Sequence, residues 1–454
     1  MAHVGVIGAG IAGLTAAHHL QQHSPHTASV LEATSHVGGV IRSERAEGYL
    51  IEHGPNSLRA SSEALGQTIM DLGLMDSVVK ANSEAATRYV VRDGVPVALP
   101  LSVSDFVTTP LFSARAKWRL LREPFVSRSA SDEEESVASF VRRRLGPEIL
   151  DYAVAPFVGG VFAGRPDALS VQHAFERLSE LETDHGSLLW GGLRSALQGD
   201  SERPPGPSGL FSFQNGLQTL PAALHEALGE QVYLDAPVSG LTPKDEQWIV
   251  QHDGNGAATQ FDGVICTAPL HRVSDLMVET SVDCTPLYDV AYPPLQVVAL
   301  GYKREAIAHP LDGFGLLVPP VEDTFDILGT IFSSTLFPNR APEGHVLLTT
   351  FVGGARAPDQ ARTSEKAIRH IVERDLDRLL GVQAPPTFAR HIHWPHAIPQ
   401  YALGYGAVKD TLSALESAHP GLVFAGNYRQ GVSVGDAMDS GLDAARRLAS
   451  TLSP

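Results

Sequence analysis

The amino-acid sequence predicts an α/β protein, with a Rossmann-like nucleotide-binding domain accompanied by a helical domain and an α+β domain. Three observations predict this class. A glycine-rich turn follows the first apolar run, an acidic residue follows the second, and short apolar runs bounded by Pro and Gly fill much of the later chain. The chain has 454 residues, more than one simple core holds, so two or three domains are expected.

The first element is a strand followed by a glycine turn and a helix. The run HVGVI is typical of a buried strand, and residues 11–23 have the composition of a helix. Gly8 permits the tight turn, Gly10 lets the backbone approach a pyrophosphate, and Gly13 allows the helix to lie close to the strand. Glu32 ends the next apolar run, at about the 20-residue offset where an acid binds a ribose hydroxyl. A plain glycine turn, the alternative, would not require all of these spacings together.

A pair of glycines after the acidic residue indicates which dinucleotide is bound. Gly38 and Gly39 stand just after the acidic strand, and Arg42 follows them. This stretch resembles the FAD-binding signature of the amine oxidase-like flavoprotein superfamily. The resemblance implies that the glycines and Arg42 lie along the pyrophosphate and the isoalloxazine; a surface salt bridge is the alternative for Arg42. The cofactor-binding residues that it implies are Gly8, Ala9, Gly10, Ile11, Ala12, Gly13, Glu32, Ala33, Gly39, Val40, Arg42, Gly54, Pro55, Asn56, Ser57, Val238, Trp394, Gly426, Val432 and Val434.

The same resemblance divides the chain. Residues 1–85, 196–270 and 390–454 are expected to form one discontinuous FAD-binding domain, with Val238 near the adenine and a helix that starts near Val434 and is aimed at the flavin. Residues 86–195 are rich in helix formers and are expected to form a helical domain, for which a membrane-facing surface is one of two interpretations. Residues 271–389 are expected to form a β-rich substrate-binding domain that ends in a helix.

Composition limits the partners. The net charge of −17 argues against nucleic acid, because binding phosphates requires a basic surface. The two cysteines, Cys266 and Cys284, are too few for a disulfide framework or a cysteine metal site, so a reducing compartment is expected. No signal peptide precedes Val4, and no apolar run reaches the ~18 residues of a spanning helix. We expect a soluble protein, or one attached to a single face of a membrane.

Six motifs, in order, carry a more specific resemblance. They are GPNS, GGVFAGRPDALS, LGTIFSSTLFPNRAP, TTFVGG, WPHAIPQY and AGNYRQGVSVGDAMDSG. Together they resemble the protoporphyrinogen oxidase family, from His3 to about Leu448. The resemblance implies non-covalent FAD, oxygen as the acceptor, and the six-electron oxidation of protoporphyrinogen IX or coproporphyrinogen III to the porphyrin in haem biosynthesis. It also implies a cytoplasmic location and is compatible with peripheral contact to the inner membrane and with a homodimer.

The resemblance places the substrate between apolar side chains. Phe314, Leu317, Ile331 and Phe351 would sandwich the macrocycle, and the backbone carbonyl of Gly160 would face the pyrrole N–H groups. Ordinary sheet core is the alternative for the apolar residues. No side chain is assigned a catalytic role, because N5 of the flavin carries out the hydride transfer.

The sequence departs from mitochondrial-type members after the Leu-Pro of VALPLSVSDF. Those members often carry an arginine there that pairs with a substrate propionate, whereas this chain has Ser102, Ser104 and Asp105. Propionate recognition is therefore expected to differ, with turnover of both porphyrinogens. His391, His393 and His396 include an HxH pattern, but no metal site is assigned because no acidic or cysteine partner stands close in sequence.

Other functions stay open on the sequence alone. An amine oxidase or a carotenoid desaturase would share the superfamily, although no cysteine that could tether a flavin follows Cys284. A non-catalytic protein that binds FAD and a porphyrin would show no turnover. The basic stretch from Arg115 to Arg128, with Trp118, Leu120 and Leu121, fits either an anionic lipid surface or a solvated helix over the pocket.

Overall fold

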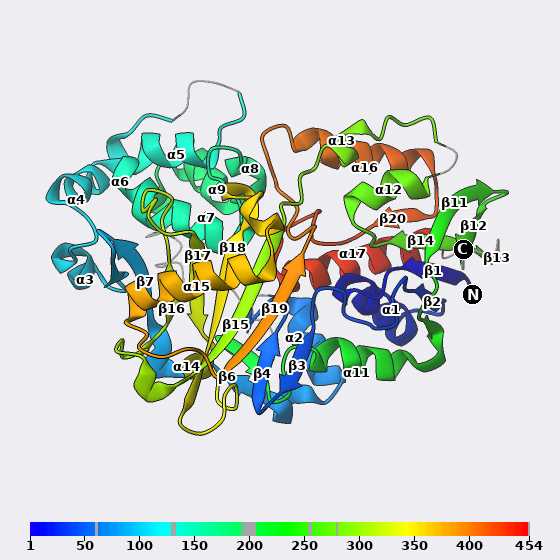
Figure 1. Ribbon diagram of the computed structural model, residues 1–454. Coiled ribbons are helices and arrows are strands. Elements are labelled where there is room, and N and C mark those ends of the chain that lie inside the picture. Colours follow the sequence, from blue (N-terminus) through cyan, green and yellow to red (C-terminus); the bar gives the residue numbers. More distant parts are fainter. Residues whose placement is uncertain are drawn as a thin grey trace.

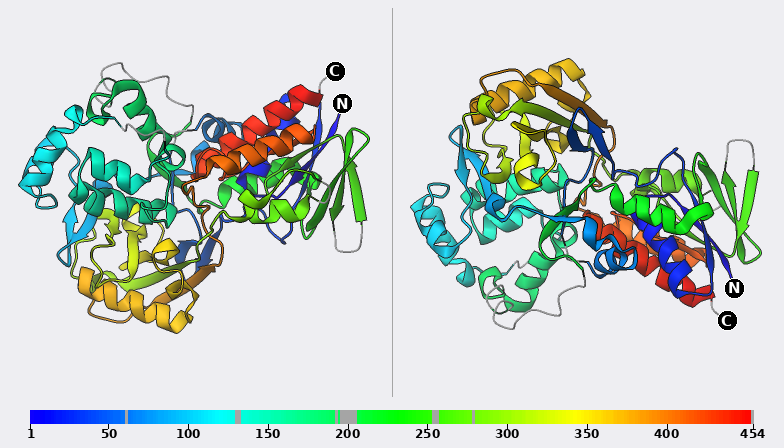
Figure 2. Two further views of the ribbon diagram at one scale, coloured as in Figure 1. Left: turned by 90° about the horizontal axis from the view of Figure 1, so that it is seen from above. Right: turned by 90° about the horizontal axis from the view of Figure 1, so that it is seen from below.

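The computed structural model describes residues 1–59, 62–128, 133–191, 194, 206–252, 257–277 and 280–452. The chain forms two lobes, and both termini lie in the same lobe (Figures 1 and 2). Among the described residues, no helix is both long enough and apolar enough to cross a bilayer.

The lobe with the termini contains a five-stranded parallel sheet. Its order is β10 (Val232–Tyr233), β2 (Thr27–Leu31), β1 (His3–Ile7), β14 (Gly263–Cys266) and β20 (Leu422–Phe424). The predicted strand and helix at the start of the chain are confirmed, since β1 is followed by α1 (Ile11–His23). The sheet joins three distant segments of the chain, as a discontinuous nucleotide-binding fold requires.

Helices cover both faces of this sheet. On one face lie α1, α2 (Glu63–Asp71), α11 (Thr219–Leu228) and α17 (Val434–Leu452). Figure 1 shows α1 in blue beside α17 in red, and their contact is close because a β-carbon at Gly441 would stand 2.2 Å from the carbonyl oxygen of Ala12. On the other face lie α12 (Leu270–Leu276), α13 (Thr285–Tyr288), α16 (Gly406–Ala418) and a small sheet of β11 (Val238–Lys244), β12 (Gln247–His252) and β13 (Ala257–Phe261).

The second lobe contains a seven-stranded sheet, antiparallel except where β16 meets β7. Its order is β19 (Phe388–Trp394), β15 (Leu295–Lys303), β18 (His345–Gly353), β17 (Ile327–Phe332), β16 (Gly313–Leu317), β7 (Thr87–Arg92) and β8 (Val95–Ala98). One side is covered by α15 (Glu365–Leu380), which confirms the helix expected at the end of this range and whose start is capped by Ser364. A short helix, α14 (Ser333–Leu336), follows β17.

The range expected to be helical begins differently. Its first residues form β7 and β8 and extend the seven-stranded sheet, because Gly315 of β16 pairs with Arg88 of β7. The helices follow: α3 (Val103–Thr108), α4 (Ala114–Leu121), α5 (Val137–Arg144), α6 (Pro147–Ile149), a π-helical turn (Leu150–Val154), α7 (Ala155–Phe162), α8 (Val171–Ala174) and α9 (Glu176–His185). The proposed boundary at residues 195 and 196 lies outside the described residues, and the three-domain division stays a prediction.

Short strands link the two lobes. A hairpin of β3 (Ser43–Ala46) and β4 (Tyr49–Glu52) leaves the glycine-rich segment, and Tyr49 lies in one core cluster with residues of the seven-stranded sheet. A further small sheet has the order β5 (Leu58–Arg59), β9 (Leu210–Phe213) and β6 (Val78–Lys80). These strands surround the segment that connects the nucleotide-binding turn to the second lobe.

Candidate active site

The glycine turn has the geometry that its sequence predicts. Gly8 has φ +99°, a left-handed conformation that glycine adopts without strain. A β-carbon at Gly13 would stand 2.1 Å from the carbonyl oxygen of Gly8, so only glycine lets α1 lie this close to the turn. The hydroxyl of Thr267, just after β14, donates to the carbonyl oxygen of Ile7 at 2.7 Å and supports the turn from the neighbouring strand.

Space for a dinucleotide lies directly in front of this turn. A β-carbon at Gly10 would meet no atom within 4 Å, whereas those at Gly8 and Gly13 would collide with the protein. Oε2 of Glu32 accepts a hydrogen bond from the backbone N–H of Ala9 at 2.8 Å, which holds the carboxylate beside the turn. The N-terminus of α1 is open, Gly10 has no β-carbon that would block a ligand, and a carboxylate lies beside the turn. This arrangement fits a dinucleotide.

A cavity of about 760 Å³ runs from the turn into the second lobe. Its lining begins at residues 10–12, passes residues 53–57 and ends between α7 and the seven-stranded sheet. Of the sequence-predicted residues, it is lined by Gly10, Ile11, Ala12, Gly39, Val40, Gly54, Pro55, Asn56, Ser57, Trp394, Gly426, Val432, Val434, Gly160, Phe314, Leu317, Ile331 and Phe351. Residues from both lobes and from most of the chain therefore meet along one continuous space.

The remaining predicted residues lie behind the lining. Gly8, Ala9, Gly13, Glu32, Ala33, Arg42 and Val238 are not lining residues of the cavity. The first five form the turn and its acidic neighbour. Val238 begins β11 two residues after Ala236, whose N–H donates to the carbonyl oxygen of Glu32 at 2.8 Å. The structure thus brings the β11 end next to Glu32, although their sequence separation is large.

Trp394 and His53, which line the cavity, form a connected group with Arg42, which does not. Nε1 of Trp394 donates to the carbonyl oxygen of His53 at 2.8 Å. Nε of Arg42 donates to the carbonyl oxygen of Gly39 at 3.2 Å, and its guanidinium carbon lies 5.9 Å from the Trp394 ring centre. Burial lowers the pKa of Arg42, and the nearby Glu32 opposes this effect. These contacts are with a carbonyl and a ring, rather than with the surface carboxylate of the alternative interpretation.

The far end of the cavity is an apolar slot between α7 and the sheet. A β-carbon at Gly160 would stand 2.7 Å from Cδ2 of Leu317, so glycine lets the helix backbone come close to β16. Ile331 is paired with Gly315 on the neighbouring strand, and Phe351 packs beside Leu295 and Leu328. The lining of the slot is apolar and includes the aromatic rings of Phe314 and Phe351, a character that suits an apolar ring system.

Arg88 is a lining residue that the sequence analysis missed. Its guanidinium carbon lies 5.2 Å from the ring centre of Phe314, and it is the only Lys or Arg among the described residues that line the cavity. Tyr89 follows it and donates from its hydroxyl to Asp312 at 2.6 Å. The signal for Arg88 is not local, because it depends on the pairing of β7 with β16.

The residues of VALPLSVSDF that stand where related proteins carry an arginine do not line the cavity. Ser102 is the N-cap of α3, and Asp105 accepts the Ser102 N–H in a capping box. Ser102, Ser104 and Asp105 are exposed and are not lining residues of the cavity. Their polar character is explained by helix capping rather than by substrate recognition.

The three histidines of HIHWPHAIPQY have different environments. His391 lies 3.7 Å from Glu365, whereas His396 lines the cavity and stacks on His271 with ring centres 4.9 Å apart. Within the described ranges, no three His, Cys, Asp or Glu side chains form a group that could hold a metal ion.

The fold and the site together define a flavin-binding class of oxidoreductase. The family model described as "Flavin containing amine oxidoreductase" matches residues 11–449. A solved structure from Exiguobacterium sp. 255-15 has the same fold, with a TM-score of 0.83 and 21% identity over 99% of this chain and 98% of its own. The cofactor of this family is a flavin, in agreement with the dinucleotide turn.

Curated relatives narrow the class. Protoporphyrinogen oxidase 2 (chloroplastic/mitochondrial) of Arabidopsis thaliana is 36% identical over 97% of this chain and 92% of its own length. Coproporphyrinogen III oxidase of Bacillus subtilis (strain 168) is 29% identical over 97% of this chain and 96% of its own. The chain therefore belongs to the protoporphyrinogen oxidase family of the flavin-containing amine oxidoreductases.

Proposed function

We propose that this chain oxidises a porphyrinogen to the porphyrin with non-covalently bound FAD, in the six-electron step of haem biosynthesis. The observation that carries the proposal is the continuous cavity from the glycine turn to the apolar slot. Bound FAD supplies an acceptor for hydride from a methylene bridge. The protein is then required mainly to orient two flat partners and to exclude water from the space between them.

One end of the cavity would bind the cofactor and the other the substrate. Glu32 would bind the ribose, Arg42 the pyrophosphate and Val238 the adenine edge, while residues 54–57 and Trp394 would lie along the flavin ring. Phe314, Leu317, Ile331 and Phe351 would enclose the macrocycle, and the Gly160 backbone would face its pyrrole nitrogens. The close approach of α7 to Leu317 supports this last assignment, since it leaves the Gly160 backbone uncovered by a side chain of its own beside the slot.

Protoporphyrinogen IX is the substrate that the charge of the site favours. Arg88 can hold carboxylates at one edge of the ring through charge-assisted hydrogen bonds. Coproporphyrinogen III carries propionates on all four pyrroles, so two would enter the apolar slot, where the described lining offers no further Lys or Arg. A buried carboxylate without a partner is strongly disfavoured. The Arabidopsis relative, named for protoporphyrinogen, agrees with this choice.

The test is aerobic incubation of the FAD-loaded protein with each porphyrinogen, followed by porphyrin fluorescence and oxygen uptake. We expect faster turnover of protoporphyrinogen IX, with oxygen consumed as the acceptor. Faster turnover of coproporphyrinogen III would overturn the substrate choice. Turnover of amines or carotenoids alone would favour the superfamily alternatives, and a bound porphyrin with no turnover would favour a carrier.

We further propose peripheral contact with an anionic membrane. Trp118 of α4 is 69% exposed and Phe125 is 88% exposed, next to the basic stretch from Arg115 to Arg128. Leu189 and Trp190 are also exposed, and the backbone N–H of Leu189 donates to the carboxylate of Glu123 two residues before Phe125. Apolar side chains beside cations are typical of a surface that lies on anionic lipid.

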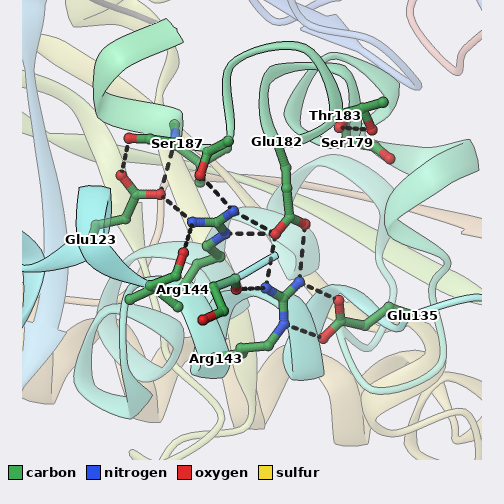
Figure 3. Close-up of polar contacts among 12 residues, drawn as sticks. Glu123, Glu135, Arg143, Arg144, Ser179, Glu182, Thr183 and Ser187 are labelled. Atoms are coloured by element: carbon green, nitrogen blue, oxygen red, sulfur yellow. Dashed lines mark hydrogen bonds and ion pairs between the residues drawn. The ribbon is translucent and has the colours of Figure 1, made fainter. Parts of the chain in front are cut away.

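A cluster of buried and half-buried ion pairs lies behind this surface (Figure 3). Arg144 is fully buried and binds Glu123 at 3.1 Å and Glu182 at 2.5 Å, and Arg143 pairs with Glu135 and Glu182. Large apolar side chains are thus exposed on this surface although a buried apolar cluster, with Phe112, Phe140 and Val141, forms the core of the same helices. Because the ion pairs join η3 (Glu123–Phe125) to α5 and α9, they hold the exposed residues in place. A cytoplasmic location and a homodimer remain part of this proposal.

A further inference from the structure

A buried ion pair joins the FPNRA segment to the strand that leads into the site. Nη2 of Arg340 lies 3.2 Å from Oε1 of Glu52 and donates to Oγ of Ser212 at 2.6 Å. Arg340 is 3% exposed and Glu52 is 4% exposed. Neither residue is part of the cavity lining in the described chain, so neither is explained by contact with substrate or cofactor.

Glu52 is held on several sides. It accepts hydrogen bonds from the hydroxyl of Ser43 at 2.5 Å and from the backbone N–H of Leu217 at 3.0 Å. The backbone of Arg340 contributes as well, because its carbonyl accepts from the N–H of Leu50 at 3.1 Å. Arg340 therefore binds β4 through both its side chain and its main chain.

The cavity-lining segment starts at the next residue. His53 directly follows Glu52, and residues 53–57 line the cavity. The N–H of His53 donates to the carbonyl oxygen of Arg42 at 2.9 Å, and the carbonyl of His53 accepts from Trp394. The position of β4 thus decides where the segment lies relative to Arg42 and Trp394.

This pair is poorly suited to a purely stabilising role. Nη1 of Arg340 is buried and has no hydrogen-bond partner. Burial raises the pKa of Glu52. Arg340 and the hydrogen bonds that Glu52 accepts from Ser43 and Leu217 oppose that effect. Well-packed apolar residues in place of a buried ion pair are often as stable or more stable. A buried ion pair at such a site therefore points to a role in fixing the position of the neighbouring backbone.

We propose that Arg340 and Glu52 are positioning residues for the flavin, which act through β4 to fix residues 53–57 against it. This role rests on the proposed location of the flavin beside those residues. It concerns the cofactor and not the substrate. Measuring FAD binding therefore distinguishes failure of this positioning role from failure of the proposed porphyrinogen oxidation.

The experiment compares Arg340→Met, Glu52→Gln and the double variant with wild type. FAD dissociation constants come from titration of the apoprotein by flavin fluorescence, and absorption spectra are recorded after reconstitution. We expect each single variant to weaken FAD by about tenfold, by analogy with the loss of a partner behind a metal ligand, and to alter the flavin spectrum. The double variant should lose less than the product of the single effects, because it removes both buried charges.

A matched control separates positioning from stability. Asp375 of α15 is a fully buried carboxylate that accepts the backbone N–H groups of Asp326 and Ile327 and pairs with Arg374, so it supports β17 and not β4. Asp375→Asn should lower the Tm of the apoprotein while the Kd for FAD stays within about twofold of wild type. The same pattern in Arg340→Met or Glu52→Gln would overturn the proposal.

Arg340→Lys covers the case in which Arg340→Met does not fold. Lysine keeps the charge but cannot span Glu52 and Ser212 with one planar group. We expect a folded protein with weakened FAD and an altered flavin spectrum. A folded Arg340→Lys variant with the wild-type Kd and spectrum would overturn the positioning role.

Discussion

Gly13 lies so close to Gly8 that a β-carbon on residue 13 would stand 2.1 Å from the Gly8 carbonyl oxygen. Gly10, between them, has no atom within 4 Å of the corresponding position. Gly13 and Gly10 therefore have different roles: Gly13 determines how closely α1 approaches the turn, whereas Gly10 leaves space for a ligand.

Alanine substitutions should separate these roles. Gly13→Ala should lower both the Tm of the apoprotein and FAD binding, because the turn itself must move. Gly10→Ala should leave the apoprotein Tm near wild type and weaken FAD, since its methyl group enters only the ligand space. Calorimetry and flavin titration measure the two effects. Full FAD affinity in Gly10→Ala would mean that the cofactor does not approach this backbone.

Arg88→Met should raise the KM for protoporphyrinogen IX by about tenfold or more, because a charge-assisted hydrogen bond contributes about 1.5–3 kcal/mol. Its flavin content should not change, since Arg88 lies at the slot end of the cavity. Ser104→Arg is the control: this residue is exposed on α3, so the KM should stay at the wild-type value. A changed KM in Ser104→Arg together with an unchanged KM in Arg88→Met would instead assign the propionate site to the α3 segment.

Phe351→Ala should raise the KM for the porphyrinogen and leave bound FAD near one per chain. Phe351 packs against Leu295 and Leu328 at the slot, where aromatic stacking adds about 0.5–1.5 kcal/mol beyond area burial. Steady-state kinetics and the flavin-to-protein absorbance ratio provide the measurements. Parallel loss of flavin would show that Phe351 supports the core instead.

Replacing Trp118 and Phe125 together by Ser should reduce co-sedimentation with vesicles that contain anionic lipid. Both side chains are largely exposed, so the change should leave the Tm unaltered. Wild-type protein on neutral vesicles is the control for the contribution of the basic stretch, and added salt should weaken binding. Equal sedimentation of wild type and variant would contradict a membrane-facing role for this surface.

The protein should lose stability as pH falls from about 7 to about 5, and His19→Gln should reduce that loss. Burial, with the charges of His23, Arg446 and His18, lowers the pKa of His19 from 6.5 to about 4. The unfolded chain therefore takes up a proton near pH 6.5 that the folded chain takes up only near pH 4. Stability is lost across that interval as the pH falls. Tm values against pH, for both proteins, test the sign; an unchanged slope in His19→Gln would assign the titration to another group.

The nucleotide-binding turn could be predicted from the sequence because its information is local. The strand, the glycines and α1 occupy 21 consecutive residues, His3–His23, and each follows from backbone freedom or apolar periodicity within that window. The same holds for α15, where Ser364 and a regular apolar pattern mark the start and the buried face. The six ordered motifs placed the chain in its family by the same kind of local signal.

Only the tertiary structure placed Arg88 in the cavity and Arg340 against Glu52. Both relationships depend on pairing between segments far apart in the chain: β7 with β16 for Arg88, and the FPNRA segment with β4 for Arg340. Strand formation depends on such neighbours more than on intrinsic preference, so residues 87–98 were expected to be helical and instead extended a sheet. The sequence by itself determined that the chain has a dinucleotide-binding fold, and it determined the family to which the chain belongs. The pairing of β7 with β16 decided that Arg88 lines the cavity, and the contact of the FPNRA segment with β4 decided that Arg340 meets Glu52, because those positions exist only after distant segments have met.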